Sequence, residues 1–345
     1  MAQRPAAEVD PVSAAFVIDK SQAVATAGSC FAQHIARTLA VQGFNYLIGE
    51  RAPPGRESDP SYGMFSARYG NIYTARQLLQ LVQRVYGLFV PEEDAWRAPN
   101  GRLIDPFRPR IEEGGFLDEP TFTADRATHF DAVRDVIETC DVFVFTLGLT
   151  EAWRSKKDGA VVPFHPGVFG AESDDYEFHN FSVAEVEADL RLAIELLRTA
   201  NPGMRIVLTV SPVSLIATYE DRHVLVSTVY SKSVLRVVAE TVTRSLANVA
   251  YFPSYEMITG PHAGRSSFED DLREVRPEAV ASVMQTFSRH YLTATPGENR
   301  APALEPAILD TRLSAADAED FDLLNKAICD EQVIENALAE QNVRC

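Results

Sequence analysis

The chain contains little cysteine, few basic residues and no long apolar run. It has four cysteines in 345 residues and no C-x-x-C pair, which excludes a thioredoxin-like redox motif and a disulfide scaffold. A net charge of -17 argues against nucleic acid or an anionic membrane surface as a partner. There is no run of about 18 apolar residues and no apolar signal segment, so we expect a cytoplasmic protein with reduced thiols.

Motifs for cofactors and metals are also absent. The next glycine after Gly28 is Gly43, so the chain has no G-x-G-x-x-G dinucleotide-binding motif. No H-x-x-x-H pair or Cys/His cluster has the spacing of metal ligands. We therefore expect neither a cofactor nor a metal ion. With 46% hydrophobic and 23% charged residues, the chain is long enough for one large α/β domain and an appendage.

The most informative segment lies around Gly28. Residues 23–27 are small or β-branched, and apolar residues then recur at helical spacing. This pattern predicts a buried strand that breaks at Gly28 into a helix, with Ser29 and Cys30 at the break. A helix N-terminus lowers the pKa of a thiol and stabilises a nearby oxyanion. The same pattern equally fits an N-cap followed by a buried thiol.

Repeated strand–helix units predict a doubly wound, three-layer α/β/α domain. We expect a flavodoxin-like parallel sheet of five strands in the order 2-1-3-4-5, with the pocket at the carboxyl ends of the strands. Helices should begin after Tyr73, at the capping box Ser182-Val-Ala-Glu185 and at Pro277. The predicted strands are residues 23–27, 44–48, 141–147, 205–210 and 249–253.

The remaining segments are the long connections within the α/β domain and the regions before and after it. Residues 87–127 and 152–181 are long for connections in a compact domain, and we interpret them as lids or binding loops. Residues 1–20 form an N-terminal extension of the α/β domain at 21–293. The rest, 294–345, reads as a linker followed by an acidic helical tail, through which the chain could form an oligomer.

The motif Gly28-Ser29-Cys30-Phe31-Ala32 resembles the signature of the GSCFA family, and the resemblance extends from about residue 20 to 293. This family looks like a branch of the SGNH (GDSL-type) esterases and acyltransferases. The resemblance implies that Cys30 takes the position of the nucleophile, with Ser29 as the fallback. Its register also implies that Gly70 and Asn71 belong to an oxyanion-hole block. In the third block, Gly148-Leu-Thr150-Glu151, Thr150 and Glu151 replace the usual asparagine and aspartate.

SGNH enzymes carry sequence blocks in a fixed order, and the segment of this chain at the position of the fifth block departs from their pattern. The corresponding segment, 271–277, has no histidine, so the usual triad cannot be assembled there. His179 is our first candidate for the base, followed by His223 and His262, although His179 equally suits a structural hydrogen bond. His34 could raise the thiolate population of Cys30 but is more typical of a helix surface. The remaining histidines, His129, His165 and His290, read as ordinary loop or surface residues.

Lys232 lies in Tyr230-Ser-Lys-Ser233, which opens a helix, and it could face an anionic substrate.

The resemblance implies acyl-ester hydrolysis or O-acyl transfer through a covalent acyl-enzyme. The expected substrate is an O-acylated sugar, glycan or related metabolite, and acyl-CoA is one possible donor. The alternative is a non-catalytic SGNH-like binding protein that lacks a complete triad.

Overall fold

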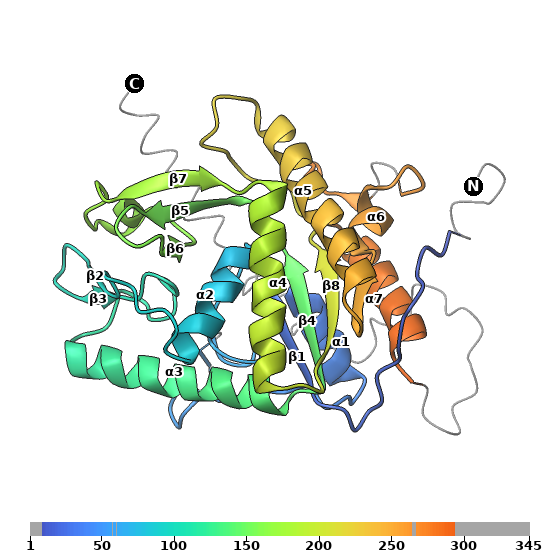
Figure 1. Ribbon diagram of the computed structural model, residues 1–345, viewed down its shortest axis with the longest axis horizontal. Coiled ribbons are helices and arrows are strands. Elements are labelled where there is room, and N and C mark those ends of the chain that lie inside the picture. Colours follow the sequence, from blue (N-terminus) through green and yellow to red (C-terminus); the bar gives the residue numbers. More distant parts are fainter. Residues whose placement is uncertain (1–8, 57, 60, 264–266, 294–345) are drawn as a thin grey trace.

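The computed structural model describes residues 9–56, 58–59, 61–263 and 267–293. Its centre is a parallel sheet in the order β1-β4-β8-β9 (Figure 1). The four strands are almost wholly buried, as in parallel sheets whose two faces are both covered. They are β1 (Val24–Gly28), β4 (Val142–Leu147), β8 (Arg205–Val210) and β9 (Val249–Phe252).

Helices cover both faces of this sheet, because successive strand residues point to opposite sides. One apolar core joins Val142 and Val144 of β4 to α1 (Ala32–Val41), α6 (Ser254–Thr259) and α7 (Pro277–Tyr291). The other core joins Phe143 and Phe145 to α2 (Ala75–Val85), α3 (Glu119–Thr139), α4 (Val183–Ala200) and α5 (Val224–Ser245). The three-layer α/β/α class predicted from the sequence is therefore present.

The strand expected at residues 44–48 is reduced to a single parallel bridge between Tyr46 and Val24. Two hydrogen bonds of 2.9 Å hold it: Val24 N–H donates to the Asn45 carbonyl, and Leu47 N–H donates to the Val24 carbonyl. The chain then leaves the sheet edge at Gly49, whose N–H donates to the Ser66 carbonyl at 2.8 Å. The described sheet thus has four strands, and the predicted fifth strand contributes only this bridge.

The two segments expected to be long loops form small antiparallel sheets. The second contains β5 (Glu151–Ser155), β6 (Val161–Val162) and β7 (Tyr176–Asn180) in the order β6-β5-β7, with a short 3-10 helix at Pro166–Phe169. The first contains the hairpin of β2 (Trp96–Arg97) and β3 (Leu103–Ile104), and its last residues begin α3. The Trp96 indole N–H donates to the Tyr176 hydroxyl at 3.1 Å, which joins the two layers.

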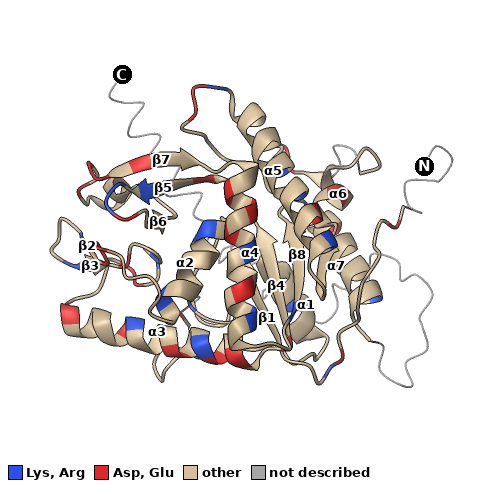
Figure 2. Cartoon of the chain, viewed as in Figure 1, with Lys and Arg blue, Asp and Glu red and all other residues tan. Residues whose placement is uncertain are grey.

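The helix starts predicted from the sequence after Tyr73, at Ser182 and at Pro277 are confirmed. Thr74 and Ser182 both form complete capping boxes, and Pro277 is the first residue of α7. Charged residues lie mainly on the helices and loops around the sheet, with both signs interspersed along α3 (Figure 2). No helix in the described part of the chain has an apolar stretch long enough to span a membrane. The predicted linker and tail at 294–345 lie outside the described residues.

Candidate active site

The turn after β1 requires glycine at position 28. Gly28 has φ 137°, and a Cβ atom there would lie 2.7 Å from the Thr146 backbone nitrogen of the neighbouring strand β4. Ser29 and Cys30 follow at the carboxyl end of β1. The Cys30 carbonyl accepts a hydrogen bond from Gln33 N–H at 3.1 Å, so Cys30 lies in the turn that leads into α1. The sequence therefore presents both side chains at the C-terminal edge of the sheet.

Two further segments meet this turn. Ile72 N–H donates to the Gly28 carbonyl at 2.8 Å, and Gly148 N–H donates to the Tyr73 carbonyl at 2.9 Å. A Cβ atom on Gly148 would lie 3.2 Å from the Cβ of Ser29. The segments around Gly28, Gly70 and Gly148, which the family resemblance assigned to one site, thus converge in space.

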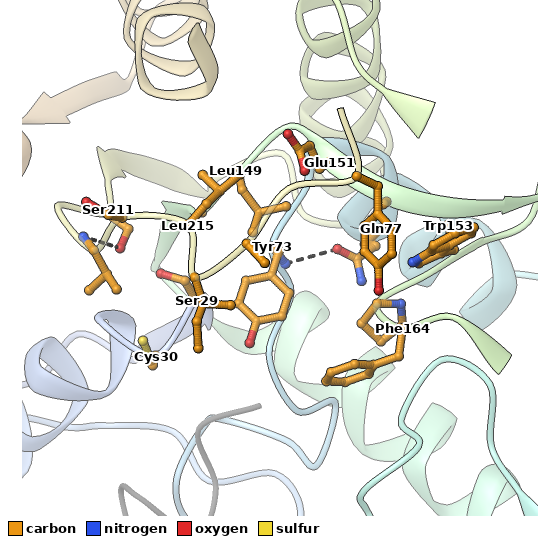
Figure 3. Close-up of a pocket in the computed structure, with 18 of the residues that line it drawn as sticks. Ser29, Cys30, Tyr73, Gln77, Leu149, Glu151, Trp153, Phe164, Ser211 and Leu215 are labelled. Atoms are coloured by element: carbon orange, nitrogen blue, oxygen red, sulfur yellow. Dashed lines mark hydrogen bonds between the residues drawn. The ribbon is translucent and has the colours of Figure 1, made fainter. Parts of the chain in front are cut away.

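A cavity of about 130 Å³ opens at this junction (Figure 3). Ser29 and Cys30 lie on one side of it, with Tyr73 beside them (Figure 3). Glu151 and Lys232, two other residues singled out in the sequence, also line it. Most of the remaining wall is apolar and includes the aromatic residues Trp153, Phe164, Phe178 and Tyr219. A largely apolar pocket with a few convergent polar groups is the usual form of a small-molecule site.

Lys232 is a buried cation on the wall of this cavity. Its side chain is only 2% exposed, and its Nζ donates a hydrogen bond to the Gly148 carbonyl at 2.6 Å. Burial lowers the pKa of Lys232 to about 7, with the nearby charge of Arg273 acting in the same direction and Cys30 opposing it. Part of the Lys232 population is therefore a neutral amine at neutral pH, which is the form that accepts a proton.

Ser29 and Cys30 differ in their access to the cavity. Ser29 is 3% exposed, and its Oγ has no hydrogen-bond partner within the described structure. Cys30 is only partly buried. The other cysteine in the described part of the chain, Cys140, is 1% exposed, and burial raises the pKa of its thiol to about 12. Of these two thiols, Cys30 is the one that a substrate could reach.

Three other predicted residues lie outside this cavity. Thr150 is buried and turned away: its N–H donates to Ser231 Oγ at 3.0 Å, and its hydroxyl donates to Asn180 Oδ1 at 2.7 Å. Gly70 and Asn71 line a second, neighbouring cavity instead. Glu151 does face the first cavity, where it accepts a hydrogen bond from the Thr218 hydroxyl at 2.8 Å and burial raises its pKa.

The candidate histidine bases do not line the cavity. His179 is on β7, and its Nε2 lies 2.8 Å from Oε1 of Glu185, the residue that closes the capping box of α4. His223 is the N-cap of α5, and its Nδ1 accepts a hydrogen bond from Leu225 N–H at 3.1 Å. His262 follows α6 and packs against Gly260. The structure thus places His179 and His223 in structural hydrogen bonds.

His34 is also unsuited to activating the thiol through its charge. Its ring contacts Phe31, with the ring centroids 5.4 Å apart. Burial, assisted by the charge of Arg37, lowers the pKa of His34 to about 4. The imidazole is therefore neutral at neutral pH and does not stabilise a thiolate electrostatically.

Among the basic residues of the cavity wall, the sequence analysis missed His165 and Arg273. His165, interpreted as an ordinary loop residue, lines the cavity and packs on Trp153 with the ring centroids 4.3 Å apart. Arg273 comes from the segment that lacks the SGNH histidine, and its Nε donates to the Ser214 carbonyl at 3.1 Å. Arg273 could have been suspected from its segment, whereas His165 carries no local signal.

The fold and the site define an α/β protein whose candidate reactive cysteine lies at the C-terminal edge of a parallel sheet. The GSCFA family model matches residues 23–287, and the chain belongs to the GSCFA family. A comparison with curated proteins gave no match. Among the described residues, no group of three His, Cys, Asp or Glu side chains could hold a metal ion.

Proposed function

We propose that this protein is an SGNH-like esterase or O-acyltransferase that carries the acyl group as a thioester on Cys30. One observation carries the proposal: Cys30 and a buried lysine with a lowered pKa line the same small cavity at the carboxyl ends of the strands. If the bridge at Tyr46 is counted as the remnant of a strand, the strand order is also that of a flavodoxin-like sheet.

In the proposed first step, neutral Lys232 takes the proton of the Cys30 thiol. The thiolate attacks the acyl carbonyl carbon and forms a tetrahedral intermediate. The Lys232 ammonium then gives its proton to the leaving oxygen, so the carbon–oxygen bond breaks and a thioester remains. A base with a pKa near the working pH suits both transfers, because it accepts and donates protons with equal ease.

Stabilisation of the oxyanion is assigned to the start of α1 and to Ser29. The backbone N–H groups at a helix N-terminus and the positive end of its dipole favour a negative charge there. Ser29 lines the cavity, and its buried hydroxyl has no hydrogen-bond partner within the described residues, so we assign it the role of a donor to the oxyanion. Removal of one such donor typically costs about 3 to 4 kcal/mol in transition-state stabilisation.

In the second step, water or an acceptor hydroxyl attacks the thioester. Lys232 removes the proton of the attacking group and returns it to the Cys30 sulfur as the carbon–sulfur bond breaks. The cavity volume of about 130 Å³ limits the acyl group. A cavity of about 150 Å³ holds a benzene molecule, so we expect a short acyl chain. Activated acyl esters and acyl-CoA are both candidate donors.

Mass spectrometry of the intact protein tests the proposal. We expect p-nitrophenyl acetate to leave one acetyl group on the wild type and none on Cys30→Ala. Ser29→Ala should still form the adduct, but more slowly. An adduct that survives in Cys30→Ala and disappears in Ser29→Ala would transfer the nucleophile role to Ser29. No adduct on any of the three proteins, with this ester or with acetyl-CoA, would favour the non-catalytic binding protein.

A further inference from the structure

A second cavity, of about 950 Å³, adjoins the cavity of Cys30. Pro163 and Phe164 line both cavities. Gly70 and Asn71 line the second cavity, whereas Tyr73, close by in the same segment, lines the first. The two spaces therefore lie on either side of one wall.

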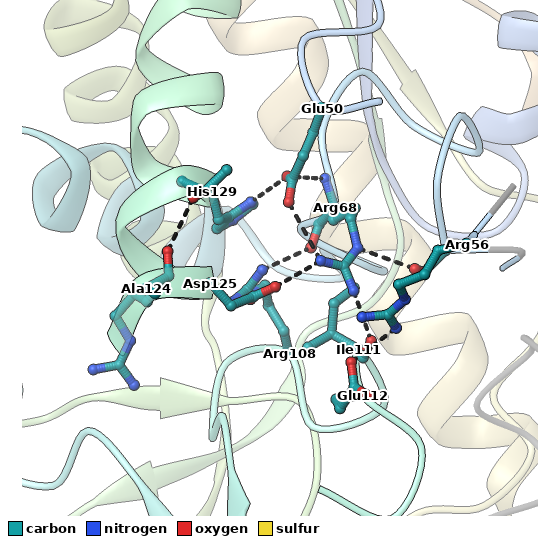
Figure 4. A network of polar contacts seen from close by, with 12 residues as sticks. Glu50, Arg56, Arg68, Arg108, Ile111, Glu112, Ala124, Asp125 and His129 are labelled. Carbon is teal, nitrogen blue, oxygen red and sulfur yellow. Dashed lines mark hydrogen bonds and ion pairs between the residues drawn. The ribbon is translucent and has the colours of Figure 1, made fainter. Parts of the chain in front are cut away.

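Figure 4 shows a network of paired charges, and four of its residues, Arg56, Arg108, Ile111 and Glu112, also line the second cavity. The Arg68 guanidinium is nearly inaccessible and contacts Asp125 of α3 at 2.7 Å and the Ile111 carbonyl at 2.9 Å. Arg108, which lines the cavity, contacts the other oxygen of Asp125 at 2.7 Å and Asp105 at 3.0 Å. Because buried charges persist only when paired, these contacts fix the loops before any ligand binds.

The lining of this cavity mixes apolar and polar residues, and its charges are balanced. Arg56, for example, pairs with Asp59 at 2.7 Å and with Glu112 at 2.8 Å. Aromatic residues such as Phe107 and Phe169 line it together with two amide side chains, Asn71 and Asn100. The charged lining residues are Arg56, Arg108 and Arg110 against Asp59, Glu112 and Glu113.

This balance disfavours a polyanion such as coenzyme A, which needs a surplus of cations. A sugar suits the cavity better, because each hydroxyl both donates and accepts hydrogen bonds and the ring faces are apolar. The volume of about 950 Å³ is at the upper end of the range for small-molecule sites and leaves room for several sugar rings.

We propose that the second cavity binds a neutral oligosaccharide, whose hydroxyl group takes the acyl group from Cys30 past the wall of Pro163 and Phe164. This proposal rests on the proposed function. The acceptor oxygen bonds to the acyl carbon, the carbon–sulfur bond breaks, and the hydroxyl proton passes through Lys232 to the sulfur. The small cavity thus selects the acyl group and the large cavity selects the acceptor.

A binding experiment tests the proposed sugar site without requiring the acyl-transfer reaction. Maltotriose, cellotriose and chitotriose are titrated against the full-length protein by isothermal calorimetry, with coenzyme A as the charged comparison. Ala98→Trp fills the second cavity, whereas Arg97→Trp places the same ring on an exposed neighbour that lines neither cavity. We expect at least one trisaccharide to bind the wild type and Arg97→Trp, and to bind Ala98→Trp about tenfold or more weakly.

Three results would overturn the site: no trisaccharide binds, Ala98→Trp binds as tightly as the wild type, or coenzyme A binds and Ala98→Trp weakens its binding. Asn100→Trp, at the exposed rim of the same cavity, replaces Ala98→Trp if that variant fails to fold. Release of p-nitrophenol from p-nitrophenyl acetate reports the chemistry at Cys30 separately. If that reaction is absent while the trisaccharide result holds, the proposed function fails and the binding site remains.

Discussion

Lys232→Met should stabilise the folded protein at neutral pH and, under the proposed mechanism, strongly reduce turnover. Methionine keeps the length and the apolar character of the buried stem but removes the amine. The pKa of Lys232 falls from its ordinary value of 10.5 to about 7 on folding. At about 1.4 kcal/mol per pH unit, this lowering costs the wild type about 5 kcal/mol of unfolding free energy below pH 7. Loss of the hydrogen bond to the Gly148 carbonyl destabilises the variant by about 1 to 3 kcal/mol. We therefore expect a net increase in the free energy of unfolding of about 2 to 4 kcal/mol.

The lowered pKa of Lys232 makes the stability difference between wild type and variant depend on pH. Between pH 7 and 10.5 the unfolded chain binds the Lys232 proton and the folded chain does not, so the stability of the wild type rises with pH in this window. The advantage of Lys232→Met is therefore largest below pH 7 and disappears above pH 10.5. Urea unfolding at pH 6 and pH 9 measures this difference, and ester turnover should fall by about two to four orders of magnitude. A variant that is less stable than the wild type by the same amount at both pH values would refute the reasoning.

Three other predictions concern the groups around the nucleophile. Cys30 should react with iodoacetamide faster than the buried Cys140 in peptide mapping, and equal rates would remove the argument for an accessible thiol. His179→Ala should leave ester turnover nearly unchanged, because His179 bonds to a helix cap; a loss of about two orders of magnitude at an unchanged melting temperature would make it the base. Arg273→Gln should move the acidic limb of the pH–rate profile to higher pH, because the charge of Arg273 lowers the pKa of Lys232. Arg273→Lys should leave the limb in place, and an unmoved limb in both variants would contradict the assignment.

Features that depend on neighbouring residues were predictable from the sequence. The break after β1 follows from small residues before Gly28 and helical periodicity after it. The capping boxes at Thr74 and Ser182 satisfy backbone groups within four residues, so their geometry is local. The four described parallel strands were readable as apolar runs because both faces of the sheet are covered.

Features that depend on distant contacts were not predictable. The segment 44–48 has the composition of a strand, but the chain leaves the sheet edge at Gly49, whose N–H bonds to the Ser66 carbonyl instead of to β1. The strands β5 and β7 pair antiparallel and most of their residues are only partly buried, so no apolar run revealed them. The burial of Lys232 depends on α5 packing beside the turn after β4, which no pattern near Lys232 indicates.

The missing histidine of the fifth block need not mean a missing base. In the SGNH pattern that segment would supply an imidazole, whereas here it supplies Arg273, a permanent cation on the cavity wall. A cation near a buried lysine favours the neutral amine, and burial acts in the same direction. Under the proposed mechanism, Lys232 and Arg273 together therefore do what the histidine does elsewhere: they provide a base whose pKa lies near neutrality. Under this proposal, the departure from the SGNH pattern is an exchange of the base rather than the loss of the activity.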